Sequence, residues 1–315
     1  MNWRKMRFWA WPSELRRLGV LGINARNLHC IAPLNPRRLF VRVDDKVLTK
    51  QICCANGIPA PETYGLVTRF GDIRRFRQTV GNRQQFVIKP ACGAGGRGVL
   101  VVAKNLGESF ETSSGQMLSA ADVRYHLAST LSGLFSLGGQ PDKAIIEQRV
   151  IRHPVFAELA VGGTPDVRII VRQGRPVAGM LRLPTQESRG RANLHQGAIG
   201  VGLDIRSGTT TTAVHHNRIV DRHPDTGMPI AGLVIPFWSD VVLMAARLSE
   251  ALELGYVGVD IVLDAARGPV VLEANARPGL AIQIANGRGL LLQLQPDTVG
   301  KVERTDSRTL AAGRP

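Results

Sequence analysis

Two apolar strand-like stretches near the C-terminal end, joined by a four-residue turn at Ala265–Gly268, constrain the fold of this chain most strongly. If they pair as an antiparallel hairpin around that turn, Asp264 faces Pro269 and Asp260 faces Glu273. The acidic residues of this hairpin sit among Val, Ile and Leu, which is typical of buried strands. The sequence therefore predicts an antiparallel sheet that carries carboxylates into an apolar environment.

The same hairpin places three oxygen donors together. Because side chains alternate along a strand, Glu273 and Asn275 point to the same face as Asp260. Two carboxylates directly opposite each other repel, and a cation bound between them would offset that repulsion. Oxygen-only ligands suit Mg²⁺ held jointly with nucleotide phosphates. The alternative is that Asp260 lies at an exposed edge and Glu273 pairs with an arginine.

A glycine-rich loop, 91–98, connects the strand-like stretches Phe86–Lys89 and Val99–Val102. It lacks the Gly-Lys-Ser/Thr ending of a P-loop, and the segment after it looks extended, whereas a dinucleotide-binding turn is followed by a helix. We therefore interpret it as a hairpin lid whose backbone N–H groups close over phosphates, with Lys89 supplying a cation. The alternative is an ordinary glycine-rich hairpin with an exposed lysine.

Further polar residues interrupt the apolar pattern in the middle of the chain. Arg191 and Asn193 alternate onto one face of an extended segment and can hold a transferring phosphoryl group. His195 next to them is either a base or, more simply, a hydrogen-bonded structural histidine. Arg168 and Arg182 lie within apolar strands and require anionic partners if they are buried, either a substrate carboxylate or a nearby aspartate.

The remaining pattern predicts an α+β protein. Helical periodicity marks 44–56, 119–131 and 240–254, and extended stretches cover 144–147, 167–171 and 176–183. Short loops join some of the strands and helices join others. This mixture favours largely antiparallel sheets over a regular βαβ array.

Positive charge is concentrated at the start of the chain. The net charge is +15, and the first 50 residues hold 11 Lys/Arg against 3 Asp/Glu. Trp3, Phe8, Trp9 and Trp11 are interleaved with these charges, so the segment is a solvated helix covering the body or a surface for anionic lipid or nucleic acid.

The sequence also bears on the compartment. No apolar run approaches the roughly 18 residues that a spanning helix needs, and the start is too short for a signal-peptide core. The four cysteines lack C-x-x-C spacing and are expected to be small buried residues in a reducing compartment. We expect a cytoplasmic protein, with peripheral membrane association through its basic start as an option.

Taken in order, these segments resemble the ATP-grasp superfamily from Asp44 to about Leu292. The segment from Asp166 to Gly197 is similar to ribosomal-protein glutamate ligases, and the whole is most similar to alpha-L-glutamate ligase-like proteins. The segments that carry the resemblance are Asp45-Lys46, Phe86–Pro90, the glycine loop, Ile145-Ile146-Glu147, Asp166-Val167-Arg168, Arg191–His195, Gly258–Ile261 and Glu273–Gly279.

This resemblance implies an ATP-grasp fold in which two α+β lobes clasp ATP between antiparallel sheets. The expected divisions are a basic N-terminal arm (1–43) in place of the usual preceding α/β domain, a first lobe with the lid (44–143), a second lobe with the metal site (144–295) and a disordered tail (296–315). Extra sequence at 152–163 separates Glu147 from Asp166.

The resemblance also implies a role for each matching residue. Lys46 and Lys89 would contact ATP phosphates under a lid containing Gly95, Gly96 and Gly98. Glu147 and Gln148 would meet the adenine, and Asp166 the ribose or adenine edge. Arg191 and Asn193 would face the γ-phosphate, and Arg277 would stabilise an acyl phosphate. Asp260, Glu273 and Asn275 would hold Mg²⁺, or Mn²⁺ in its place, with two ions expected.

The reaction expected from this resemblance is ATP-dependent carboxylate–amine ligation through an acyl phosphate. Glutamate is the carboxylate that the resemblance suggests, and the amine acceptor is a peptide, a protein or a small molecule. One alternative is an ATP-grasp phosphotransferase. Another is a basic membrane- or nucleic-acid-binding module with a vestigial nucleotide site, although nucleic acid is not the expected partner. The basic arm is expected to dock on a membrane or on an acidic protein.

Overall fold

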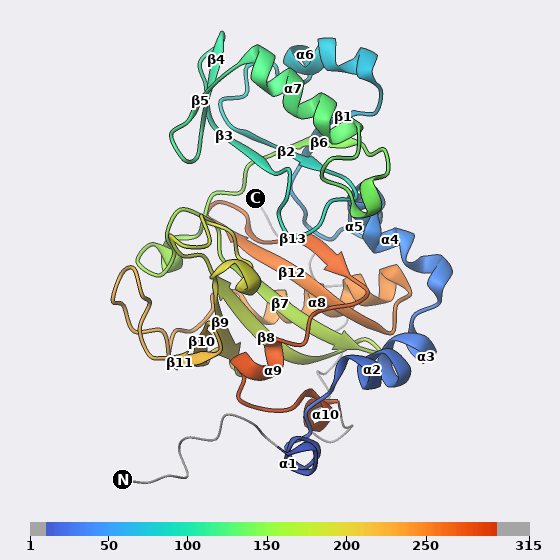
Figure 1. Cartoon of the computed structure of the whole chain (residues 1–315), viewed down its shortest axis with the longest axis vertical. Helices are drawn as coiled ribbons and strands as arrows, with labels where there is room; N and C mark the ends of the chain where they lie inside the picture. The colour runs from blue at the N-terminus through green and yellow to red at the C-terminus, as the bar shows by residue number, and fades with distance from the viewer. Residues whose placement is uncertain (1–10, 295–315) are drawn as a thin grey trace, which may run out of the picture.

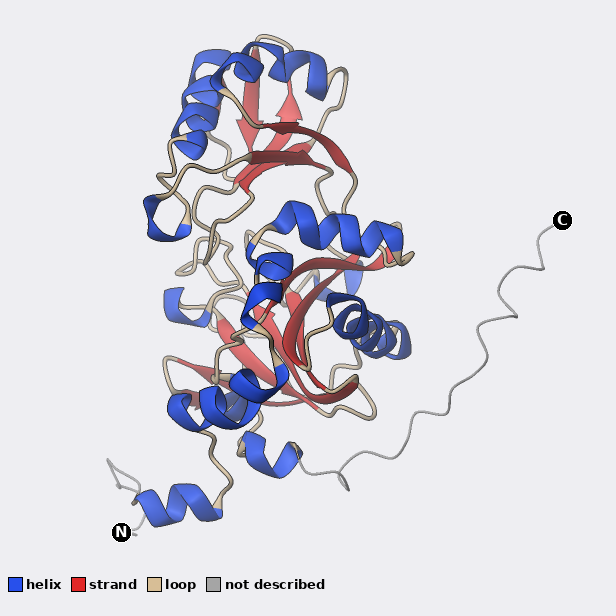
Figure 2. Ribbon diagram, turned by 90° about the vertical axis from the view of Figure 1, so that its right-hand side faces the viewer, coloured by secondary structure: helices blue, strands red, loops and turns tan. Residues whose placement is uncertain are grey.

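The computed structural model describes residues 11–294 as two lobes stacked along the long axis, each built around its own sheet (Figure 1, Figure 2). The first lobe holds a six-stranded sheet in the order β1-β6-β2-β3-β4-β5, and every neighbouring pair is antiparallel. Its strands are β1 (Thr63–Val67), β2 (Phe86–Pro90), β3 (Leu100–Asn105), β4 (Ser109–Thr112), β5 (Met117–Ser119) and β6 (Ala144–Glu147).

Helices cover the apolar face of this sheet. Helices α6 (Phe76–Val80) and α7 (Ala120–Leu131), with a 3₁₀ helix at Phe70–Arg75, share a buried core with Phe86 and Ile88 of β2. Helix α7 begins at the predicted position, where Ser119 Oγ accepts from the Asp122 backbone N–H at 3.2 Å and Asp122 accepts in return from the Ser119 N–H at 2.8 Å. Lys89 of β2 and Glu147 of β6 lie on the opposite face of the sheet.

The second lobe holds a seven-stranded antiparallel sheet in the order β11-β10-β9-β8-β7-β12-β13. Its strands are β7 (Asp166–Arg172), β8 (Arg175–Leu183), β9 (Ile199–Leu203), β10 (Thr210–His215), β11 (Arg218–Val220), β12 (Tyr256–Asp264) and β13 (Gly268–Asn275). The expected α+β class with antiparallel sheets is confirmed. Strand β6, at 144–147, pairs with β1 and β2, so the first lobe extends past the boundary expected at residue 144.

Both faces of the second sheet are covered. Helix α8 (Trp238–Leu252) buries Val241, Ala245, Leu248 and Leu252 against one face, as its periodicity predicts. Short elements cover the other face, and they include α9 (Ile282–Ala285), α10 (Leu290–Gln293), α2 (Ile23–Arg26) and α3 (Ala32–Leu34). Every residue of β12 is buried as a result, so any charge on that strand requires an internal partner.

The β12–β13 hairpin corrects one detail of the predicted register. Asp264 pairs with Gly268 and Leu263 with Pro269, so the turn is one residue shorter than expected. A bulge beyond Asp260 restores the register, and Asp260 lies opposite Glu273 as predicted. The bulge thus keeps the carboxylates paired although the turn differs.

The expected N-terminal arm is largely part of the body. From Leu21 onward the chain contributes buried residues to the second-lobe core, and Asn35 binds both backbone groups of Tyr256. After α1 (Pro12–Arg17) and α2, this segment continues through a π-helical turn (Asn27–Ile31), a 3₁₀ helix (Arg37–Leu39), α4 (Val41–Asp44) and α5 (Lys46–Ala55). The aromatic residues at 3, 8 and 9 and the expected tail at 296–315 lie outside the described residues.

Within residues 11–294, the structure contains no helix that is both long and apolar enough to cross a bilayer.

Candidate active site

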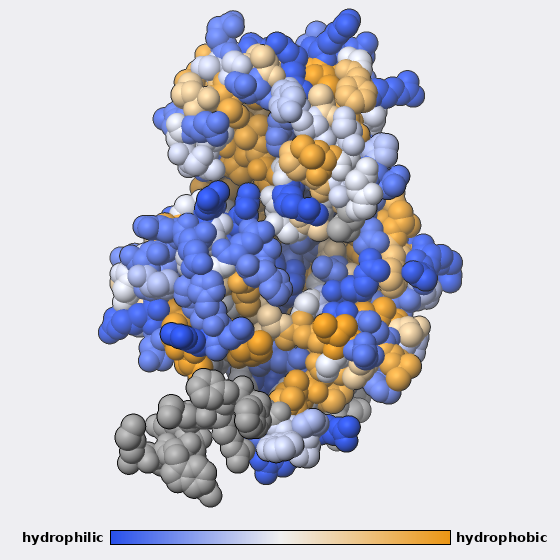
Figure 3. All heavy atoms as spheres, viewed as in Figure 1, coloured by the Kyte–Doolittle hydropathy of each residue, from blue (hydrophilic) through white to orange (hydrophobic). Residues whose placement is uncertain are grey.

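The predicted site residues gather where the two lobes meet. Helix α5, the glycine loop and the end of β6 approach this junction, together with β13 and the segment at 191–196 (Figure 1). Figure 3 shows hydrophilic side chains at the waist between the lobes on the face it displays.

A lysine–glutamate cluster lies on the inner face of the first sheet. Glu147, at the end of β6, is 2% exposed, and its two oxygens lie 2.7 Å from Lys89 Nζ and 2.5 Å from Lys50 Nζ. Burial alone would raise the pKa of Glu147, but the two lysines hold it below its usual range. Burial in turn lowers the pKa of Lys50 against the attraction of Glu147. The Glu147 carboxylate is therefore saturated by lysines.

Lys50 is a component that sequence reasoning missed. It lies on α5 four residues after Lys46, and residues at that spacing share one face of a helix. The four-residue spacing of Lys46 and Lys50 was the feature of the sequence that could have identified Lys50. The neighbouring Gln148 is held by Glu62: its backbone N–H donates to the Glu62 carbonyl at 2.8 Å, and its Oε1 accepts from the Glu62 N–H at 3.4 Å.

Lys46 joins the two lobes. Its Nζ donates to the Gly93 carbonyl of the glycine loop at 2.5 Å and lies 3.9 Å from Glu273 Oε2 on β13. The N-cap Asp45 fixes the start of α5 by accepting from the Val47 N–H at 2.8 Å, and it also accepts from Lys143 Nζ at 2.6 Å. The first turn of α5 therefore carries a cation to the junction between loop and hairpin.

The glycine loop meets the second lobe. Gly95 and Gly96 have φ values of +64° and +71°, and Cβ atoms there would lie 3.6 Å from Asn193 Nδ2 and 3.8 Å from Arg191 Cδ. Gln196 Nε2 also donates to the Gly95 carbonyl at 3.4 Å. The structure thus brings the loop together with the Arg191–Asn193 segment, which the sequence placed near the same phosphates.

Gly98, at the end of the glycine loop, packs against the Phe135 ring. Its φ is +71°, and a Cβ there would lie 2.4 Å from the Phe135 side chain. Glycine is therefore required at this position on both conformational and steric grounds.

Two arginines and two aspartates form a buried network in the second sheet. Arg168 donates to both oxygens of Asp260 at 2.7 and 2.6 Å. Arg182 donates to both oxygens of Asp166 at 2.5 and 2.8 Å and also to Asp260 Oδ2 at 2.7 Å. The partners of the two arginines are thus aspartates, one of the two alternatives that the sequence left open.

This network shifts the two carboxyl groups in opposite directions. Burial would raise the pKa of Asp260, but Arg168 and Arg182 hold it well below the usual range. Burial raises the pKa of Asp166 despite Arg182, and the neighbouring Asp260 charge adds to the rise. Asp260 is therefore the firmly ionised member of the pair.

The three expected metal ligands differ in accessibility. Asp260 is fully buried, with both oxygens bonded to arginines. The Glu273 side chain is 36% exposed, and Asn275 Oδ1 accepts from the Arg277 backbone N–H at 2.8 Å. The Glu273 carboxylate and the Asn275 amide oxygen are ligands that suit a hard cation, whereas both oxygens of Asp260 are engaged by arginines.

Arg277 contacts the segment before α5. Its guanidinium lies 3.5 Å from Asp44 Oδ2 and 5.0 Å from the centre of the Phe40 ring. These contacts tie the turn after β13 to α4.

The antiparallel lobes, with a glycine-rich loop and a lysine of α5 facing a carboxylate-bearing hairpin, define a protein of the ATP-grasp class. More particularly, the chain belongs to the sugar-transfer associated ATP-grasp family, whose model matches residues 25–298. The match begins inside the segment expected to be an arm, in agreement with the packing of residues from Leu21 onward.

Curated relatives and solved structures extend this comparison. The chain is 25% identical over 279 residues to a "Probable alpha-L-glutamate ligase" of Pseudoalteromonas translucida, covering 88% of this chain and 68% of the relative. A protein of the same name from Pasteurella multocida is 26% identical, covering 86% of this chain; the chain spans 64% of that relative's length. The RimK domain protein ATP-grasp from Sphaerobacter thermophilus aligns with a TM-score of 0.44 at 16% identity, covering 82% of this chain and 69% of that one.

Proposed function

We propose that this chain is an ATP-dependent carboxylate–amine ligase that forms an amide through an acyl phosphate. The family and the names of the curated relatives support a ligase that forms carbon–nitrogen bonds. The observation that carries the proposal is the position of Lys46, whose ammonium lies between the glycine loop and Glu273. A triphosphate at this point meets cations from one side and a metal-binding carboxylate from the other.

ATP is assigned to the junction of the lobes. Lys46 and Lys89, with the backbone N–H groups of Gly95, Gly96 and Gly98, would bind the phosphates. The backbone around Glu147 and Gln148 is the proposed adenine contact, because the Glu147 carboxylate is already held by two lysines.

Asp166 has a revised role in this proposal. Because its carboxylate binds Arg182, we assign it to positioning that arginine rather than to touching the ribose.

The metal site is assigned to the acidic hairpin. Glu273 and Asn275 would hold Mg²⁺, or Mn²⁺, with Asp260 joining them or fixing the local charge through its arginines. When bound, the cation neutralises charge on the phosphates, and two ions are proposed.

The chain's own residues mainly position the reactants. Arg191 and Asn193 would hold the γ-phosphoryl group while a substrate carboxylate oxygen attacks phosphorus and ADP leaves. An amine then attacks the acyl carbon, its proton is lost to solvent, and phosphate leaves as the amide forms. Arg277 would face the acyl phosphate after releasing its contact with Asp44. No side-chain nucleophile is required.

The names of the relatives support glutamate as the carboxylate substrate, and the acceptor is an amine of a peptide, a protein or a small molecule. The test is incubation with ATP, Mg²⁺ and pooled amino acids or peptides, with phosphate release and mass spectrometry of the products. We expect a new amide together with equimolar ADP. ADP without any amide would replace the ligase proposal by a phosphotransferase.

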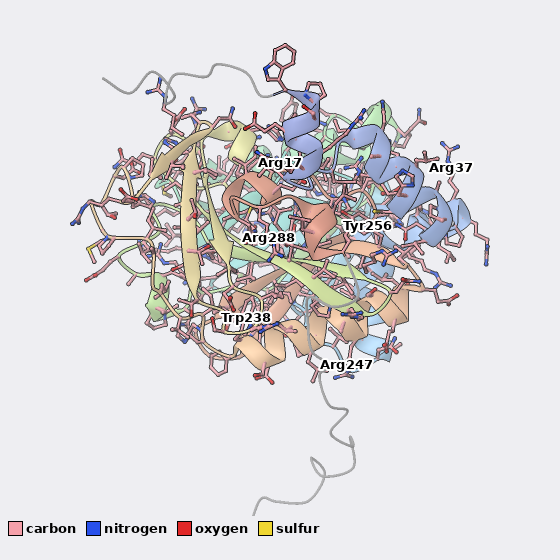
Figure 4. The ribbon with its side chains drawn as sticks, turned by 90° about the horizontal axis from the view of Figure 1, so that it is seen from below. Arg17, Arg37, Trp238, Arg247, Tyr256 and Arg288 are labelled. Carbon is pink, nitrogen blue, oxygen red and sulfur yellow. The ribbon has the colours of Figure 1, made fainter. Side chains whose placement is uncertain are left out.

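The exposed part of the N-terminal segment supports a second, peripheral role. Trp11, Ile23 and Leu28 are 62%, 64% and 66% exposed, and the same segment carries the exposed Arg16, Arg17 and Arg37. Figure 4, seen from the end opposite the first lobe, shows Arg17 on α1 and Arg37 on the 3₁₀ helix at Arg37–Leu39. Apolar side chains flanked by arginines favour the surface of an anionic membrane.

Vesicle co-sedimentation tests this role. Vesicles with phosphatidylserine should pellet the full chain, and an I23S/L28S variant should bind more weakly. Equal binding to neutral vesicles, or none to either kind, would contradict the assignment and leave an acidic protein as the partner to seek.

A further inference from the structure

Three potential metal ligands meet at the edge of the second sheet. Glu187 lies in the loop after β8, His215 is the last residue of β10, and His216 begins the turn to β11. Glu187 Oε2 is 2.8 Å from His216 Nε2 and 3.4 Å from His215 Nε2. The three donor atoms lie within 4.8 Å of one another, and the Glu187 and His216 side chains are open to solvent.

His216 lies in a tight turn with a left-handed backbone. His215 pairs with Arg218, so the hairpin has a two-residue turn, and His216 and Asn217 have φ values of 47° and 61°. Such turns favour residues that adopt the left-handed conformation, of which Gly, Asn, Asp and His are the most common. The turn places the two imidazoles next to each other, with the His215 and His216 ring centroids 4.2 Å apart.

A glycine makes room for the carboxylate. Gly197 has a φ of +93°, and a Cβ there would lie 2.8 Å from Glu187 Cδ and 2.9 Å from Cγ. The Gly197 carbonyl also lies 3.0 Å from His215 Nε2. The Glu187 side chain therefore lies against backbone that only a glycine leaves uncovered, beside an imidazole that is itself positioned.

We propose that Glu187, His215 and His216 bind a divalent transition metal, with Zn²⁺ as the best match. Imidazole nitrogen and carboxylate oxygen bind Zn²⁺ at about 2.0–2.2 Å, so two ligands of a tetrahedral ion are roughly 3.4 Å apart. The separation of the His215 and Glu187 donors has this value, at 3.4 Å. The ion takes the place of two hydrogen bonds, one between His216 and Glu187 and one between His215 and the Gly197 carbonyl. Water completes the coordination.

Metal binding at this place has a consequence for the neighbouring loop. Glu187 and Gly197 bracket the segment that carries Arg191 and Asn193, so the ion would tie that segment to the β10–β11 hairpin. This consequence rests on the proposed function, whereas metal binding itself does not.

The test is a calorimetric titration of the full chain with Zn²⁺ in excess Mg²⁺, which keeps the oxygen-only hairpin site from competing. We expect about one Zn²⁺ per chain, and affinity at least about tenfold weaker in Glu187→Gln and His216→Asn. Asparagine tolerates the left-handed backbone, so His216→Asn removes the ligand without straining the turn.

Two control variants separate this site from other donors. His29→Ala removes another exposed histidine and Cys54→Ser removes the exposed thiol, and both should leave the affinity unchanged. No stoichiometric binding, or equal affinity in Glu187→Gln and His216→Asn, would overturn the proposal. The titration uses no ATP, so its failure is distinguishable from failure of the ligase assignment.

Discussion

Replacing Arg182 with methionine should destabilise the second lobe strongly. The Arg182 side chain is 12% exposed and donates three hydrogen bonds to Asp166 and Asp260. Methionine fills similar space but leaves two buried carboxylates sharing the single positive charge of Arg168. Breaking a buried ion pair from one side costs about 3–5 kcal/mol, and the loss of Arg182 should fall in that range.

Urea unfolding followed by tryptophan fluorescence measures this loss, with Trp3, Trp9 and Trp11 replaced by phenylalanine in every variant so that Trp238 alone emits. Trp238 lies at the start of α8, is 9% exposed and donates to the Ile205 carbonyl at 3.1 Å, so it reports the second lobe (Figure 4). Glu253→Gln is the control in the same lobe: Glu253 is the C-cap residue of α8, its side chain is 63% exposed, and loss of its exposed ion pair with Arg42 should leave the free energy of unfolding nearly unchanged.

The double variant Asp166→Asn/Arg182→Met isolates the cause. Removing one of the stranded charges should recover at least about 1 kcal/mol of the loss. If Arg182→Met costs no more than Glu253→Gln, or if the second substitution recovers nothing, the network is not a charge-balanced unit and the reasoning fails.

Two further predictions concern the first lobe. The pKa of Glu147 is lowered in the folded state, so its ionised form adds stability above the unfolded pKa, and that stability is lost as the pH falls through the lowered folded pKa. The free energy of unfolding should therefore fall more steeply below about pH 4.5 in the wild type than in Glu147→Gln, with the exposed Glu108→Gln behaving as wild type; identical slopes would contradict this. Gly98→Ala should raise the KM for ATP about tenfold, because a left-handed alanine costs about 1–2 kcal/mol and its Cβ meets the Phe135 ring. Gly107→Ala, with a φ of +81° and no atom within 4 Å of its Cβ, has the same backbone cost away from the lid, and an equal KM in the two variants would refute a lid role for Gly98.

The regular elements of this fold were predictable because local rules fix them. The Ser119–Asp122 capping box, the period of α8 and the alternation in β12 and β13 each depend on a few neighbouring residues. The Asp260–Glu273 pairing was predicted correctly, although the shorter turn and the bulge were not. A bulge depends on packing across the sheet, and no local pattern specifies it.

The missed features depend on contacts between distant segments. The partners of Arg168 and Arg182 were left open because an aspartate and a substrate carboxylate satisfy an arginine equally well. The N-terminal segment was assigned to an arm because it is basic and stands where the resemblance places a preceding α/β domain. Its Leu21 and Asn35 instead pack on the second sheet, through contacts that no local pattern shows. The meeting of Glu187 with His215 and His216 likewise arises only when β8, β9 and β10 align.

The most direct test of the central proposal is amide formation by a Glu273→Gln variant. Wild-type protein with ATP, Mg²⁺, glutamate and an amine pool should give equimolar ADP and amide, and the variant should be at least about a hundredfold slower. Glu253→Gln, which removes an exposed partner of Arg42 outside the site, should match the wild type. Amide formation by Glu273→Gln at the wild-type rate, with unchanged Mg²⁺ dependence, would contradict the assignment of this hairpin as the metal-binding centre of an ATP-dependent ligase.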